Sequence, residues 1–262
     1  MTTSDNIRNV EFHFTTGHTS AFMAASWDSN PLHVDADYSR KTQFGRPVLY
    51  GVSGILAALG AWARGRQFVL DHIRAQFQRP LFVGDSCTIR ITETAQGADI
   101  QILKGGQSHF RINIGLCELT PGTPAGGLAQ GDFQPLTEAR EWDGAREAGK
   151  TVPPAFAYEP DWAAAKDMEK WFGLGPNQLP AEQLSALLWS SYFVGMEAPG
   201  RQALFVDLEF AFDPPQTKGK FELRDVKLDY DARYRRLAIS GKGTGIRSFQ
   251  LNAFQRPGSV RY

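Results

Sequence analysis

An aspartate and a histidine stand five residues apart in the stretch DSNPLH, residues 28–33. The asparagine and the proline between them force a turn, so the Asp28 carboxylate and the His33 imidazole can point into one cleft. A carboxylate and an imidazole can share a water molecule and move its protons near neutral pH. The pair therefore predicts chemistry in which water is added to a substrate or removed from it.

A helix is predicted to begin a short distance further along the chain. An apolar run follows Pro47, and the backbone amides near Tyr50 and Gly51 would form the amino terminus of this helix. Such a terminus favours negative charge and can stabilise an oxyanion that develops on a carbonyl. Together with the Asp–His pair, it predicts hydration of a double bond conjugated with a carbonyl, or the reverse dehydration, without a cofactor.

The elements around this stretch recur once along the chain at a fixed offset. GAWARGRQ, residues 60–67, aligns with GMEAPGRQ, residues 195–202, which lies 135 residues later. Over residues 60–80, seven of 21 positions are identical at this offset, where average residue usage would give about one or two. The repeat indicates an internal duplication.

Each copy combines an apolar helix, at about residues 51–64 and 183–197, with strands whose apolar residues alternate. Alternation indicates antiparallel sheets with one buried face, and a helix that is mostly apolar must be enclosed. A curved antiparallel sheet around a central helix is the hot dog fold. The predicted fold is therefore an α+β tandem, or double, hot dog, with units at residues 1–120 and 151–262 and a Gly-, Pro- and Ala-rich linker at 121–150.

Two motifs carry a resemblance to a known family. DSNPLHVD followed by FGRPVLYG resembles the signature of the MaoC-like (R)-specific enoyl-CoA hydratases, also called hydratase 2, in which D-x-N-P-x-H leads through F-x-x-P to H-G. FQRPLFVGD, residues 77–85, resembles the strand segment after the family's central helix. The resemblance covers about residues 10–118. It implies a cytoplasmic lyase of acyl-CoA and fatty acid metabolism that hydrates trans-2-enoyl thioesters to (R)-3-hydroxyacyl thioesters, or dehydrates these.

The resemblance also implies roles for individual residues. Asp28 and His33 would be the catalytic pair that holds the water. Asn30 would shape the turn and form a hydrogen bond near this dyad, and the Gly51 amide would bind the thioester oxygen. Asn30, Tyr50 and Gly51 are thus the expected substrate-binding residues. Tyr50 stands where the family has histidine. Its hydroxyl would make the hydrogen bond that this histidine makes in the family, while its longer side chain would narrow the cleft.

The helix after Gly51 departs from the family again, because Leu56 and Leu59 occupy positions where relatives often have small polar residues. The 135-residue offset places Asp28 on Ala163 and His33 on Met168, so the second unit is predicted to lack a dyad. We expect one active site per chain, with the second unit enclosing the acyl group.

Composition limits the partners. The 28 basic residues equal the 28 acidic residues in number, whereas nucleic acids and anionic membranes are normally met by a basic excess. The apolar run of residues 48–63 is shorter than the roughly 20 residues that span a bilayer, and the amino terminus shows no secretory signal. Cys87 and Cys117 fit no metal spacing, and no two histidines stand four apart, so neither a metal nor a cofactor is expected.

Alternatives stay open at this stage. The chain can be a non-catalytic acyl-binding or assembly protein on the same fold, or a hot dog thioesterase. A carboxylate on the central helix would favour thioester hydrolysis, and residues 51–66 contain none. The substrate carrier can be coenzyme A or an acyl carrier protein, whose phosphates Arg64, Arg66, Arg79 and Arg201 could meet. Two double hot dogs could also pair as a homodimer.

Overall fold

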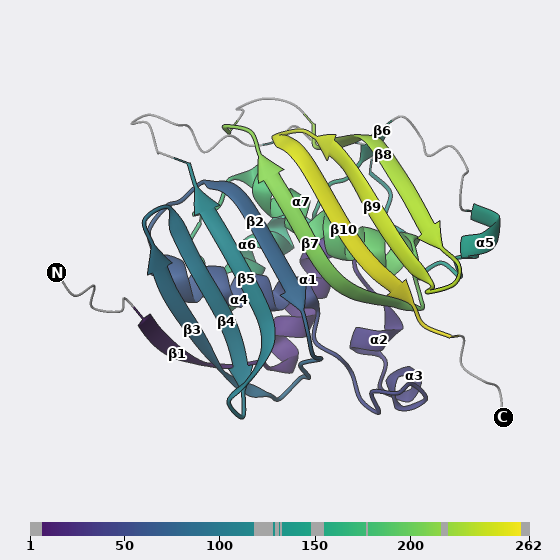
Figure 1. Ribbon diagram of the computed structural model, residues 1–262, viewed down its shortest axis with the longest axis horizontal. Coiled ribbons are helices and arrows are strands. Elements are labelled where there is room, and N and C mark those ends of the chain that lie inside the picture. The colour runs from purple at the N-terminus through teal and green to yellow at the C-terminus, as the bar shows by residue number, and fades with distance from the viewer. Residues whose placement is uncertain are drawn as a thin grey trace.

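The computed structural model describes residues 7–117, 128, 131, 133–147, 155–176, 178–215 and 220–257. The strands in these residues form one antiparallel sheet in the order β1-β3-β4-β5-β2-β7-β10-β9-β8-β6 (Figure 1). Their bounds are β1 Ile7–His13, β2 Leu70–Phe77, β3 Ser86–Thr94, β4 Gly97–Lys104, β5 Gln107–Leu116, β6 Ala155–Ala157, β7 Ala203–Phe212, β8 Glu222–Asp231, β9 Arg236–Gly243 and β10 Ile246–Gln255.

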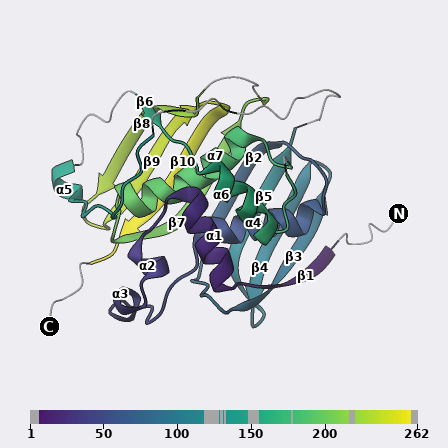
Figure 2. The ribbon, with the colours of Figure 1, turned by 180° about the vertical axis from the view of Figure 1, so that it is seen from behind.

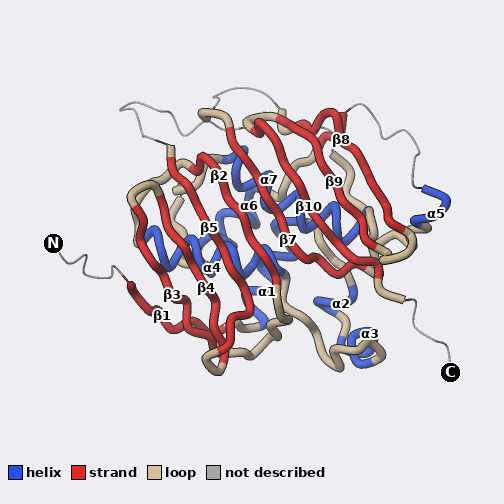
Figure 3. Tube along the Cα trace, in the orientation of Figure 1, coloured by secondary structure: helices blue, strands red, loops and turns tan. Residues whose placement is uncertain are grey.

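The sheet consists of two halves with the same strand order, each with its own central helix. The first half contains α4 (Gly51–Ala63), and the second contains α7 (Ala181–Tyr192), which continues as the π-helical turn η1 (Phe193–Glu197). Both helices lie against the same side of the sheet, as Figure 2 shows from behind and Figure 3 by element type. Each half therefore wraps a curved sheet around a helix, and the predicted double hot dog is confirmed.

The two halves join edge to edge where β2 pairs with β7. In this ladder Arg74 lies opposite Glu209, and the two residues stand 135 apart, which is the offset of the sequence repeat. Equivalent positions of two copies face each other only at the pseudo-twofold axis that relates the copies. The Arg74 guanidinium donates two hydrogen bonds to the Glu209 carboxylate, of 2.9 and 2.7 Å. The junction is thus the arrangement expected for two copies of one unit side by side.

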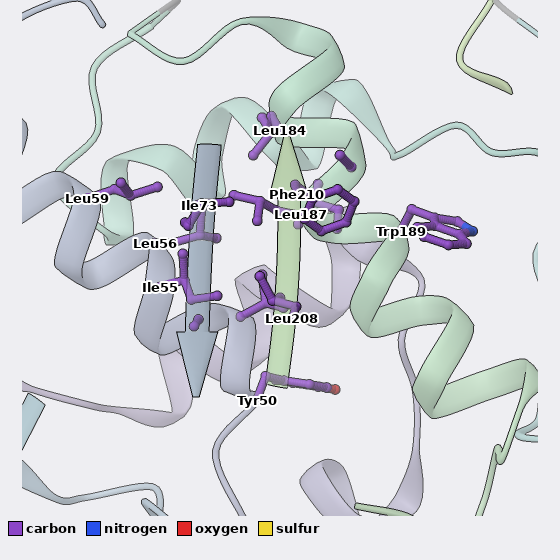
Figure 4. Close-up of a cluster of buried hydrophobic side chains, with 14 of the residues drawn as sticks. Tyr50, Ile55, Leu56, Leu59, Ile73, Leu184, Leu187, Trp189, Leu208 and Phe210 are labelled. Atoms are coloured by element: carbon purple, nitrogen blue, oxygen red, sulfur yellow. The ribbon is translucent and has the colours of Figure 1, made fainter. Parts of the chain in front are cut away.

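The core lies between the central helices and the sheet. Ile55, Leu56 and Leu59 of α4 are fully buried and lie beside Ile73 of β2 (Figure 4). Leu184 and Leu187 of α7 lie on the Phe210 side of the same cluster. Burying an aliphatic side chain of this size stabilises a fold by about 1.5–3 kcal/mol. Leu56 and Leu59, which depart from the family pattern in this helix, are therefore core residues.

The segment that carries the dyad has no counterpart in the second half. In the first half α1 (Thr16–Ser26) is followed by α2 (Pro31–Val34) and α3 (Ala36–Arg40) before α4 begins. In the second half α6 (Trp162–Trp171) packs against α1 and reaches α7 through residues 172–180 alone. Ala163 and Met168 lie inside α6, so the fixed offset does not extend back to the turn.

Most of the predicted linker lies outside the described residues. Its described part, residues 133–147 with positions 128 and 131, includes the short helix α5 (Gly144–Glu147). The domain boundaries at residues 120 and 150 stay predictions. Among the helices in the described ranges, none is long and apolar enough to cross a lipid bilayer.

Candidate active site

A cavity of about 380 Å³ opens between the two halves. The β2–β7 ladder ends at the pair of Gln76 and Asp207. Beyond that pair the strands part, and residues 77–81 and 203–206 line the cavity from its two sides. Asp28, Asn30, His33 and Gly51 also line it. The structure therefore brings the predicted catalytic pair and the predicted helix start to one cavity.

Asp28 lies in the turn that follows α1 and is only 1% exposed. One carboxylate oxygen, Oδ1, accepts a hydrogen bond from the backbone amide of Asn30 at 3.2 Å. The other, Oδ2, accepts one from the Ser191 hydroxyl at 2.7 Å. Burial raises the pKa of Asp28 to about 7, against the opposing effect of these two hydrogen bonds. Asp28 can thus be protonated or ionised near neutral pH.

His33 lies on the short helix α2, and its Nδ1 is 2.7 Å from the carbonyl oxygen of Val48. Because a carbonyl only accepts, Nδ1 carries the ring proton and donates it, which leaves Nε2 as the acceptor nitrogen. Burial lowers the pKa of His33 to about 4; the Val48 hydrogen bond opposes this and the positive charge of Arg256 adds to it. The imidazole is therefore neutral at physiological pH and able to take a proton.

Asn30 fixes the turn rather than offering free polar atoms to a ligand. Its Oδ1 accepts the Leu32 amide at 3.0 Å and so caps α2. Its Nδ2 donates to the carbonyl oxygens of Gly195 at 2.6 Å and Gly200 at 2.9 Å. The side chain is 1% exposed. Asn30 thus ties the dyad turn to the second half of the chain.

Tyr50 lies behind the dyad and is not among the residues that line the cavity. It is fully buried, and its hydroxyl donates to the backbone carbonyl of Asp28. Its ring packs on the His33 imidazole, with centroids 4.0 Å apart, and on Phe22. The sequence predicted that Tyr50 binds substrate and narrows the cleft. The structure places it instead where it supports both members of the dyad.

Gly51 begins α4, and its position suits the predicted role of its amide. The first amides of a helix have no partner within the helix and so can meet an oxyanion. A Cβ on Gly51 would lie 2.7 Å from the Phe77 ring, which itself lines the cavity. A larger residue at position 51 would therefore push Phe77 away from the helix start.

Two site residues in the second half were not predicted. Ser191 of α7 binds the Asp28 carboxylate, and Gly195 of η1 leaves room for it, since a Cβ there would lie 2.5 Å from Oδ1. Short π-helical segments often occur at functional sites. Ser191 stands 135 residues after Leu56. Applying the repeat offset to Leu56 would therefore have pointed to Ser191, a small polar residue at the position where the first helix has leucine.

Removing the Ser191 hydroxyl tests this contact directly. We expect Ser191→Ala to raise the pKa of Asp28 above about 7, because the hydroxyl stabilises the ionised carboxylate. The measurement is a carbon-13 NMR titration of the carboxyl carbon. Ser190→Ala is the matched control, since the Ser190 hydroxyl is buried but donates to the Leu187 carbonyl. Equal Asp28 titration in both variants would contradict the assignment.

Comparison with known proteins supports the motif and the fold separately. Residues 5–107 match the family model of the MaoC like domain. This part of the chain is therefore similar to the MaoC-like family. Over 91 residues the chain is 34% identical to an (R)-specific enoyl-CoA hydratase of Aeromonas caviae, which is 33% of this chain and 66% of that protein. A hydratase of the same name from Rhodospirillum rubrum is 32% identical over 76 residues, 28% of this chain and 53% of that protein.

Solved structures of similar size match the whole chain in fold. A solved MaoC-like dehydratase superposes with a TM-score of 0.61 at 15% identity and covers 95% of this chain and 97% of its own. A conserved hypothetical protein of Mycobacterium tuberculosis, described as a double hotdog, superposes at 0.59 with 13% identity and 97% coverage of both chains. At these identities the likeness shows the double hot dog fold alone.

Proposed function

We propose that this MaoC-like protein is a hydro-lyase that interconverts a 2-enoyl thioester and an (R)-3-hydroxyacyl thioester through Asp28 and His33. The observation that carries the proposal is the dyad itself. Both side chains line one cavity, and their pKa values are shifted in opposite directions, to about 7 and about 4. Pairs of titratable groups whose pKa values are driven apart are typical of acid–base catalysis.

The two pKa shifts support different roles for His33 and Asp28 during hydration. His33 takes one proton from water through Nε2 as the hydroxyl group adds to C3 of the enoyl group. Protonated Asp28 delivers its proton to C2, where the electrons of the double bond have moved. The product carries one added water, and transfer of a proton from His33 to Asp28 restores the starting state. Catalysis by positioned acids and bases contributes about 10²–10⁴ in rate.

The surroundings of the dyad suit an acyl thioester. The Gly51 amide, at the amino terminus of α4, would stabilise the negative charge that develops on the thioester oxygen. Much of the cavity is apolar, with Phe77 and Phe110 from the first half and Phe205 from the second. Such a lining favours a hydrocarbon acyl group. The thioester would be carried by coenzyme A or by an acyl carrier protein.

The two units would have different roles. The first, residues 1–120, would be catalytic, whereas the second, residues 151–262, contains none of the five histidines. The second unit would close the cavity and support Asp28 through Ser191 and Gly195. We propose one active site per chain on this basis.

The thioesterase alternative finds less support. The central helix α4 carries no carboxylate. α7, the equivalent helix of the second half, has Glu182 in its first turn, but Glu182 is not among the residues that line the cavity. The Asp28–His33 pair is thus the acid–base pair that the cavity presents, and it favours hydration of the alkene.

The test is a spectrophotometric assay with crotonyl-CoA and a longer trans-2-enoyl-CoA, in which loss of the conjugated absorbance is followed. We expect kcat/KM for hydration to be bell-shaped, because activity requires neutral His33, above about pH 4, and protonated Asp28, below about pH 7. His33→Ala should lose the activity while staying folded. A wild-type protein inert on both substrates and on an enoyl carrier protein, or an unimpaired His33→Ala, would overturn the proposal.

A further inference from the structure

Helices α2 and α3 lie beside the end of β10, as Figures 1 and 2 show, and their segment forms hydrogen bonds with the second half. They belong to the dyad segment that the second half lacks. Asn30 holds one end of this segment through the carbonyl oxygens of Gly195 and Gly200. A second anchor lies on α3, at Tyr38, and is made by two arginines of the second half.

Tyr38 lies between Arg201 and Arg256. Its hydroxyl donates to the carbonyl oxygen of Arg201 at 3.0 Å. The Nη2 of Arg256 donates to the same carbonyl at 3.0 Å and to the Tyr38 hydroxyl oxygen at 3.3 Å. The guanidinium carbons of Arg201 and Arg256 lie 5.1 and 5.9 Å from the centre of the Tyr38 ring. Cations at this distance are attracted by the face of an aromatic ring.

The guanidinium of Arg256 is buried, and it has no counterion in the part of the chain that the structure describes. The side chain is 9% exposed, and no carboxylate in the described residues forms an ion pair with it. Within the same described ranges its Nε has no hydrogen-bond acceptor. Buried charges are normally paired because burial alone is costly. An arginine that is buried without an ion-pair partner among the described residues is therefore a candidate for an electrostatic role.

Of the two dyad residues, His33 is the one on which the charge of Arg256 acts. Tyr50 packs on the imidazole, and Tyr38, which Arg256 contacts, follows on α3. The two tyrosines are hydrogen-bond donors to backbone carbonyls, and protonated Asp28 is neutral. The charge of Arg256 disfavours a second positive charge on His33.

We propose that Arg256 is a positioning residue for His33, which anchors α3 to the second half through Tyr38 and sets a positive charge beside the imidazole. The role rests on the proposed function insofar as His33 must be neutral to take a proton from water. This role gives the second half a part in catalysis besides enclosing the acyl group. The second half supplies both the contacts that anchor the dyad segment and the positive charge of Arg256.

The decisive experiment is an NMR titration of the His33 Cε1 proton, which is assigned by its absence from His33→Gln. In Arg256→Gln we expect the pKa of His33 to rise by about half a unit or more, because the cation is lost. Arg256→Lys keeps a positive charge and should shift it less. Arg233→Gln is the control, since exposed Arg233 also lies over a tyrosine ring, that of Tyr234, but far along the chain from the dyad segment.

Kinetics test the anchoring. We expect kcat for hydration to fall about tenfold in Arg256→Gln, since misplacement of a catalytic group lowers the rate. The acid limb of the pH profile should move to higher pH, because the pKa of His33 rises. Tyr38→Phe should lower kcat without moving the limb. A folded Arg256→Gln with unchanged His33 titration and unchanged kcat would overturn the proposal. If the wild-type protein hydrates no enoyl thioester, the proposed function fails, and the titration still decides the effect of Arg256 on His33.

Discussion

Asp28→Asn is expected to abolish hydration and, at the same time, to stabilise the folded protein at alkaline pH. The amide cannot deliver a proton to C2, so kcat should fall by about 10²–10⁴. Its shape is nearly that of the carboxyl group. Its oxygen can accept from the Asn30 backbone amide, and its NH2 group can donate to the Ser191 hydroxyl. The loss should therefore appear in kcat with the fold and the cavity intact.

The stability effect follows from the direction of the pKa shift. The pKa of Asp28 is raised from its ordinary value of 3.8 to about 7 in the folded protein. A group whose folded pKa is raised contributes stability that is full below its unfolded pKa and is lost as pH rises through the folded pKa. The wild type therefore loses stability between about pH 4 and pH 7 through this group, whereas the asparagine variant has nothing to titrate.

Urea unfolding of both proteins at pH 5 and pH 8 measures this. We expect the difference in the free energy of unfolding between Asp28→Asn and the wild type to grow by about 2–3 kcal/mol, in favour of the variant, between the two pH values. Taking the difference at each pH cancels the titration of groups that do not interact with residue 28. Asp167→Asn, at an exposed position paired with Lys170, is the control and should show no such growth. An advantage that does not change with pH would mean that the Asp28 carboxyl is not destabilised by burial.

Gly195→Ala is expected to have the second largest effect, although Gly195 lies in the half without a dyad. A Cβ at this position would lie 2.5 Å from Oδ1 and 2.7 Å from Oδ2 of Asp28. Such contacts cannot exist, so the carboxyl group or η1 must move. A shift of about 1 Å in a catalytic group can lower the rate about 100-fold. We expect a fall in kcat of this order.

Circular dichroism and the KM for the enoyl thioester separate displacement from unfolding. Gly175→Ala is the matched control, because a Cβ there meets only Gln178, at 3.4 Å or more, which is an ordinary contact. If Gly195→Ala keeps the full kcat, the Asp28 carboxyl tolerates displacement, and the second half is less closely coupled to the dyad than the structure indicates.

The turn that carries the dyad could be predicted because its causes are local. Asn30 and Pro31 act within a few residues of the chain: the asparagine caps α2 and the proline opens it. The repeat was also readable, since identical residues at one offset survive in the strands and helices that both copies need. The central helices and the alternating strands followed from hydrophobic periodicity, which reflects burial on one side of each element.

What surrounds the dyad was decided by tertiary structure. Three residues of the second half that contact the dyad segment lie 163 or more residues from Asp28: Ser191, Gly195 and Arg256. Their contacts form across the junction of the two halves, which no local sequence pattern describes. Tyr50 is next to Gly51 in sequence, yet its orientation depends on Phe22 and His33 packing around its ring. The residue types needed for the chemistry are thus set locally along the chain. Their pKa values depend on burial, which exists only once the two halves have closed over the turn.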